Sequence, residues 1–147
     1  MATLTEKIKT ELENICQRIT DAIENPNYGG CGIIAERLYL WLTTKGVNAK
    51  IVVLSYDPEI ISEVVKNNEL NRRFGLGHIV VKLEDGQFVD SEGVSPIENK
   101  MCRNYPQSEI PLNILVAMNI RTQGWNPTFD RDQIPQLDQL VFAGQCT

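Results

Sequence analysis

The stretch Tyr28-Gly29-Gly30-Cys31-Gly32 leads directly into Ile-Ile-Ala-Glu-Arg-Leu-Tyr-Leu-Trp-Leu at residues 33–42, a run that is apolar over most of a helical circumference. Pro26 and the glycines predict a break before Cys31, and Gly46 is suited to end a helix that starts there. Such an apolar helix is typical of the centre of a domain. The free N–H groups and dipole of its N-terminus favour a thiolate, which makes Cys31 a candidate nucleophile.

The segments on both sides of this helix have periodicities that predict an α+β domain. Before it, apolar residues recur every three or four positions behind a possible Thr5 cap, which predicts an amphipathic helix over residues 4–24. After it, a β-branched run predicts a strand over 47–56, a polar stretch from Pro58 predicts a short helix to about Asn68, and 71–77 reads as a loop before a strand over 78–83.

The chain's only histidine, His78, begins that second strand, and Asp85-Gly86 is a typical hairpin turn after it. If the turn has two residues, Val81 pairs with Asp90, and His78 lies about 10 Å further along its strand. A bulge would close this gap, or a residue of the following loop could replace Asp90. We therefore expect Asp90 to be the carboxylate that orients His78, with Glu92 as the alternative.

The segments GGCGIIAERLYLWLTTKGVNAKIVVL and GHIVVKLEDGQFVD resemble the transglutaminase-like branch of the papain-like cysteine proteinase superfamily. The resemblance covers about residues 25–95 and implies a single domain over 1–147, in which a central Cys-bearing helix packs on a small antiparallel sheet. It implies Cys31 as nucleophile, His78 as general base and acid, and Asp90 as the orienting carboxylate. Members of this branch often have aromatic residues where Gly32 and Ile79 stand here.

These residues predict acyl transfer through a thioester, without a cofactor, on a protein or peptide substrate. The amides near Cys31, Gly30 included, would hold the oxyanion, and a polar side chain at Asn25, Asn27 or Tyr28 could add a donor. Three functions are compatible with this pattern: a cysteine peptidase or amidase, which we favour, a protein-glutamine deamidase or transglutaminase, and a catalytically inactive binding domain. In the last case Cys31 would be a small buried hydrophobic residue.

Composition argues against several classes of binding partner. The formal charge is -5, and the only adjacent basic pair is Arg72-Arg73, which argues against nucleic acid. No apolar window is long enough to cross a membrane and no secretory signal precedes the domain, so we expect a cytoplasmic protein. The four cysteines form no CxxC pair, which argues against a metal site, and a reducing compartment argues against disulfides. The oligomeric state stays open.

The C-terminal third is less informative. Residues 91–107 read as an irregular loop, and the apolar run 110–120 is expected to form a helix begun by Pro111. The tail from Gly124 has little periodicity and is expected to wrap the domain or cover one end of a cleft, with a disordered or partner-binding tail as the alternative. Trp125 in this tail is a candidate for lining the cleft.

Overall fold

The computed structural model describes residues 4–23, 27–67, 76–122 and 133–142. Within these ranges the chain is an α+β protein with an antiparallel sheet of order β4-β3-β2-β1-β5, which confirms the predicted class. The helices are α1 (Glu6–Ala22), α2 (Asn27–Thr44), α3 (Pro58–Asn67), α4 (Leu112–Thr122) and α5 (Gln133–Phe142). The strands are β1 (Ala49–Ser55), β2 (Leu76–Leu83), β3 (Phe88–Asp90), β4 (Gly93–Ser95) and β5 (Gln107–Ile110), and a short 3-10 helix, η1, spans Ile97–Asn99.

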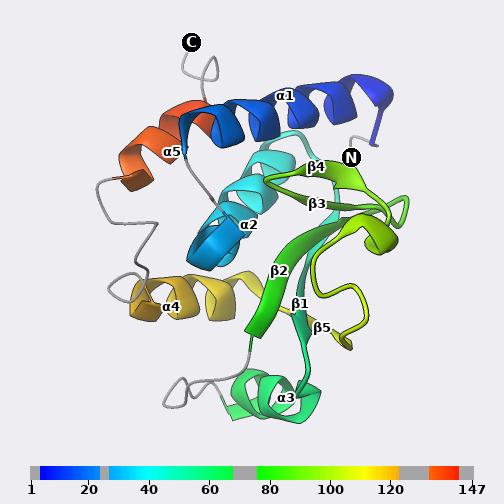
Figure 1. Cartoon of the computed structure of the whole chain (residues 1–147), viewed down its shortest axis with the longest axis vertical. Coiled ribbons are helices and arrows are strands. Elements are labelled where there is room, and N and C mark those ends of the chain that lie inside the picture. The colour runs from blue at the N-terminus through cyan, green and yellow to red at the C-terminus, as the bar shows by residue number, and fades with distance from the viewer. Residues whose placement is uncertain (1–3, 24–26, 68–75, 123–132, 143–147) are drawn as a thin grey trace.

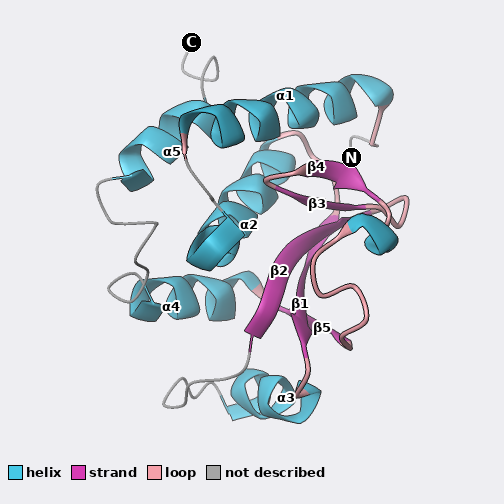
Figure 2. Cartoon of the chain, viewed as in Figure 1, coloured by secondary structure: helices cyan, strands magenta, loops and turns pink. Residues whose placement is uncertain are grey.

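Helices α1, α2, α4 and α5 lie to one side of the strands, with α2 nearest to β2 (Figures 1 and 2). The main core lies between these helices and one face of the sheet. The helices contribute the buried stripe of α1, most of α2 and one face each of α4 and α5, and the sheet contributes Ile51, Ile79 and Val81 among others. A smaller cluster on the other face contains Val52, Leu54, Val80 and Phe88, and Ile97 and Cys102 pack against it.

Helix α1 forms as its periodicity predicts. Thr5 is the N-cap, and its side chain accepts a hydrogen bond from the Ile8 N–H at 3.2 Å. Leu12, Ile15 and Ile19 are buried on one face. Capping and a single apolar stripe therefore account for both the start and the orientation of this helix.

Helix α2 is the central helix that its composition predicts, but it begins earlier than expected. It starts at Asn27, so the Gly29-Gly30 pair is helical and Cys31 is the fifth residue of the helix. Burial on several sides, shown by the consecutive buried residues Ile33, Ile34 and Ala35, offsets the low helix propensity of two glycines. The helix ends as predicted before Gly46, whose φ is 71°.

The β2–β3 hairpin has a register different from the predicted one. The Leu83 N–H donates to the Gln87 carbonyl, and Gly86 has φ 89°, so the turn is a three-residue loop with glycine in the left-handed conformation. Val81 consequently pairs with Val89. Continuing this register places Asp90 opposite Val80, on the same side of the sheet as His78, whereas the predicted pairing placed it on the other side.

Residues 91–107 are more ordered than the predicted irregular loop. Asp90 pairs with Gly93 in a second tight hairpin that adds β4, and η1 follows. The chain then runs to β5, which pairs with β1 at the opposite edge of the sheet. These short strands carry few apolar residues, so neither period nor composition signals them.

The predicted helix after Pro111 is confirmed as α4, and the tail contains a helix that its sequence did not predict. Leu137 and Val141 of α5 are buried in the main core, and the Arg18 side chain of α1 donates to the Leu140 carbonyl. Trp125 lies outside the described residues. Among the described helices, none is both long and apolar enough to cross a membrane.

Candidate active site

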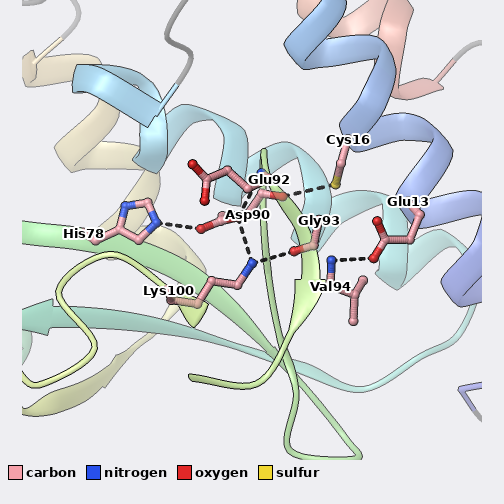
Figure 3. Close-up of polar contacts among 8 residues, drawn as sticks. All are labelled: Glu13, Cys16, His78, Asp90, Glu92, Gly93, Val94 and Lys100. Atoms are coloured by element: carbon pink, nitrogen blue, oxygen red, sulfur yellow. Dashed lines mark hydrogen bonds and ion pairs between the residues drawn. The ribbon is translucent and has the colours of Figure 1, made fainter. Parts of the chain in front are cut away.

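His78 is the third residue of β2 and is fully buried. It pairs with Leu54 of β1, next to an irregularity in the β1–β2 ladder. Its Nε2 lies 2.8 Å from Asp90 Oδ2 (Figure 3). The two residues are therefore in direct contact without a bulge between β2 and β3, because the observed hairpin register already places them on the same side of the sheet.

Asp90 is held at both of its carboxylate oxygens. Oδ2 accepts from His78, and Oδ1 accepts from the Glu92 backbone N–H and from Lys100 Nζ, each at 2.9 Å. Burial by itself raises the pKa of Asp90, but the His78 hydrogen bond and the charge and hydrogen bond of Lys100 outweigh it and lower that pKa below its ordinary value. Glu92 is exposed, so it is Asp90 that orients His78.

The second ring nitrogen of His78, Nδ1, points away from Asp90 (Figure 3) and is buried with no regular hydrogen-bond partner in the described part of the chain. Burial lowers the pKa of His78, but the hydrogen bond with Asp90 and the electrostatic interaction with nearby Cys31 raise it to about 9. Cys31 is thus close enough to the ring to influence its pKa, although no hydrogen bond joins it to Nδ1. Cys31 is half-buried at the edge of the main core.

The other described cysteines have different environments. Burial raises the pKa of Cys16 to about 12, and its thiol donates to the Asp90 carbonyl at 3.1 Å. Burial raises the pKa of Cys102, and the electrostatic interaction with Cys31 adds to this rise. Cys146 lies outside the described residues. Cys31 is thus the described cysteine that interacts with the imidazole.

The turn that carries Asp90 is hydrogen-bonded to α1 as well as to the sheet. Glu13 Oε1 accepts the Val94 N–H at 2.6 Å, and Cys16 holds the Asp90 carbonyl (Figure 3). Gly93 lies in this turn between Asp90 and Val94. Its φ is 111°, and a Cβ built on it would lie 2.5 Å from Glu13 Oε2. The backbone conformation of this turn therefore favours glycine, and a side chain at position 93 would displace the Glu13 carboxylate.

Gly32 stands where the resemblance leads one to expect an aromatic residue, and its surroundings explain the difference. A Cβ at Gly32 would lie 2.6 Å from Asn119 Oδ1 and 3.1 Å from Ile79 Cδ1. The Asn119 Nδ2 of α4 also donates to the Gly32 carbonyl at 3.0 Å and to Glu36 Oε1 at 2.8 Å. Helix α4 and strand β2 thus occupy the space that a larger side chain would need.

The predicted oxyanion and substrate residues are only partly placed. Asn27, Tyr28 and Gly30 belong to the first turn of α2, and Gly30 is buried, whereas Asn25 and Trp125 lie outside the described residues. Because α2 begins at Asn27, its free N–H groups belong to the turn before Cys31, and the dipole effect weakens beyond that turn. The predicted helix start directly before Cys31 is therefore wrong, and the free amides of α2 lie one turn earlier.

Lys100 is the site residue that sequence reasoning missed. Its side chain is 1% exposed, and Nζ donates to Asp90 Oδ1 and, at 2.6 Å, to the Gly93 carbonyl. No pattern in Glu98-Asn99-Lys100-Met101 distinguishes this lysine from a surface lysine. Only the path of the chain after β4 places it under Asp90.

No group of three or more His, Cys, Asp or Glu side chains within the described ranges has the arrangement of a metal site. The chemistry available to this arrangement is that of a thiol, an imidazole and a carboxylate in series.

Comparison of the chain with protein-family models, curated proteins and solved structures finds no match.

Proposed function

We propose that this protein is a thiol-dependent acyl-transfer enzyme of papain-like fold that acts on an amide bond of a protein or peptide, as a cysteine peptidase or amidase. One observation carries the proposal: a buried imidazole bonds Asp90 through Nε2, and Cys31 lies close enough to contribute to the raised pKa of that imidazole. In this order the carboxylate orients the imidazole and the imidazole supports the thiolate, as nucleophilic catalysis requires. The resemblance of residues 25–95 to transglutaminase-like domains supports the same assignment.

The proposed reaction has two steps. The Cys31 thiolate attacks the carbonyl carbon, a C–S bond forms, and the C–N bond breaks as His78 gives its proton to the leaving nitrogen. Water then gives a proton to His78 and its oxygen attacks the thioester carbon; the C–S bond breaks, which releases the carboxylic acid and regenerates the Cys31 thiolate and the protonated His78. The pKa of about 9 keeps His78 protonated at neutral pH, so the proton needed in the first step is present.

The first test is alkylation of each cysteine by iodoacetamide as a function of pH, followed by mass spectrometry. Cys31 is expected to react fast at pH 6–7 and at least tenfold more slowly in His78→Ala, because only a thiolate attacks the reagent. Cys16 and Cys102 serve as internal controls and are expected to react slowly, since burial raises the pKa of both. Equal rates in the two proteins would contradict the proposed pair.

The second test separates the reactions that share these residues. Incubation with a peptide library and with a glutamine-rich protein, each with the Cys31→Ala variant as control, distinguishes backbone cleavage from ammonia release. Backbone cleavage that requires Cys31 supports the peptidase. Ammonia release without cleavage would identify a deamidase or transglutaminase, and a lack of any Cys31 acyl-enzyme would favour a binding domain.

A further inference from the structure

Lys100 is an unusual residue to find in a buried site. Its ammonium is removed from solvent, and lysine is almost never fully buried without a partner. The partner here is Asp90, whose other oxygen bonds His78. His78, Asp90 and Lys100 are therefore joined in series, with Cys31 of α2 close to the His78 end and Lys100, after η1, at the other.

We propose that Lys100 is a positioning residue of the proposed thiol enzyme, which balances the charge of Asp90 so that the His78 imidazolium can give its proton to the leaving group. This inference rests on the proposed function and deepens it. Lys100 acts through Asp90 and contacts neither Cys31 nor the substrate in the proposed reaction.

Several charges surround Asp90. In the proposed reaction, the state before acylation contains two anions, the Cys31 thiolate and Asp90, and two cations, His78 and Lys100. Once Cys31 is acylated and His78 has lost its proton, Asp90 and Lys100 still form a neutral pair. Without Lys100, the same step would leave the Asp90 carboxylate buried without a counter-ion, which is costly in a low-dielectric interior.

The position of Asp90 does not depend on Lys100 alone. Its Oδ1 also accepts the Glu92 N–H, its backbone pairs with Gly93, and its carbonyl accepts the Cys16 thiol. A neutral residue at position 100 should therefore leave Asp90 near His78 while removing one of its two cationic neighbours. The full negative charge of Asp90 would then hold the His78 proton more tightly.

The charged and titratable groups that face this pair come from several elements. His78 approaches from β2, Cys31 interacts with His78 from α2, and Cys16 and Glu13 approach from α1. Asp90 and Glu13 both help to raise the pKa of Cys16, and Lys100 lowers it. Since that pKa is about 12, Cys16 stays neutral over the pH range of the test.

The test compares Lys100→Gln, Lys100→Met and Lys100→Arg with the native chain. Because His78 is the only histidine, its ring can be followed by NMR as a single signal. The two neutral variants are expected to raise the midpoint of the His78 titration by about one pH unit, a tenfold change in proton affinity. Lys100→Arg keeps the cation and is expected to stay near the native midpoint. Lys50→Gln, at an exposed lysine on β1, is the control.

Activity provides a second readout. The probes are an acyl p-nitroanilide, whose leaving nitrogen needs a proton, and the matched p-nitrophenyl ester, whose leaving group does not. Lys100→Gln is expected to slow the anilide roughly three- to tenfold and the ester much less, since a less acidic imidazolium is a weaker proton donor. Iodoacetamide alkylation of Cys31 should stay close to native, because it requires no proton transfer from His78.

Two results would overturn the role of Lys100: an unchanged His78 midpoint in a folded neutral variant, or an equal loss with anilide, ester and alkylation. If Lys100→Met does not fold, Lys100→Gln, which retains hydrogen-bond donors to Asp90 and Gly93, carries the test. Failure of the proposed function has a different signature. Native Cys31 would then be inert to iodoacetamide, while the His78 titration would still report whether Lys100 acts on it through Asp90.

Discussion

At the scale of single residues, Asp90 makes two kinds of contact with its side chain. It caps the turn that follows it, and it is the hydrogen-bond partner of His78. The structure shows both contacts, with the Glu92 N–H on Oδ1 and His78 on Oδ2. A single carboxylate can do this because it has two oxygens and about four lone-pair sites.

Asp90→Asn is expected to reduce acyl transfer on the order of 10²-fold without abolishing it, because Cys31 and His78 remain as nucleophile and base. The same change leaves Lys100 buried without a counter-ion, which is expected to cost about 3–5 kcal/mol of unfolding free energy. Turnover and urea denaturation measure the two effects. Glu92→Gln, at the exposed alternative residue, is the matched control and should change neither quantity.

At the scale of elements, the contact between α2 and α4 determines where Cys31 lies. Asn119 of α4 binds the Gly32 carbonyl, one residue after Cys31, and both Asn119 and Ile79 of β2 lie close to the position of a Cβ on Gly32. The helix that carries the thiol is thereby fixed against the strand that carries the imidazole. The close approach of α2 to α4 and β2 is possible because residue 32 is a glycine, which has no side chain.

Gly32→Ala is expected to lower the unfolding free energy by about 1–3 kcal/mol, because the new methyl group would overlap Asn119 and press on Ile79. Denaturant unfolding measures the change. In the double variant with Asn119→Ala the loss should be smaller than the sum of the two single losses, since the same atoms are involved. Additive losses would show that Asn119 is not the residue that limits position 32.

At the scale of the whole molecule, the path of the chain from one sheet edge to the other assembles the charges of the site. Strand β4 lies at one edge and β5 at the other, and Lys100 lies on the segment between them. Helix α1 contacts the turn between β3 and β4, which carries Asp90, through Glu13 and Cys16. Because the His78–Asp90 pair is buried where these elements meet, its protonation is expected to affect the unfolding free energy of the whole domain.

The raised pKa of His78 predicts how stability depends on pH. The folded value of about 9 lies above the ordinary value of 6.5, so protonated His78 contributes stability that is fully present below pH 6.5 and is lost as the pH rises through about 9. The free energy of unfolding is expected to fall by a few kcal/mol across this range. Urea denaturation at several pH values measures it, and His78→Ala should remove most of the dependence.

Apolar periodicity and capping residues act locally, and they were sufficient to predict α1, the central α2, β1, β2 and α4. The sequence also indicated Cys31, His78 and Asp90 as candidates. Contacts between elements were needed to show that α2 begins at Asn27, that a three-residue turn sets the β2–β3 register, and that Lys100 contacts Asp90. The reason is physical: burial against other elements can offset the propensity of glycines, shift a strand by one residue, and bring together side chains that no sequence period relates.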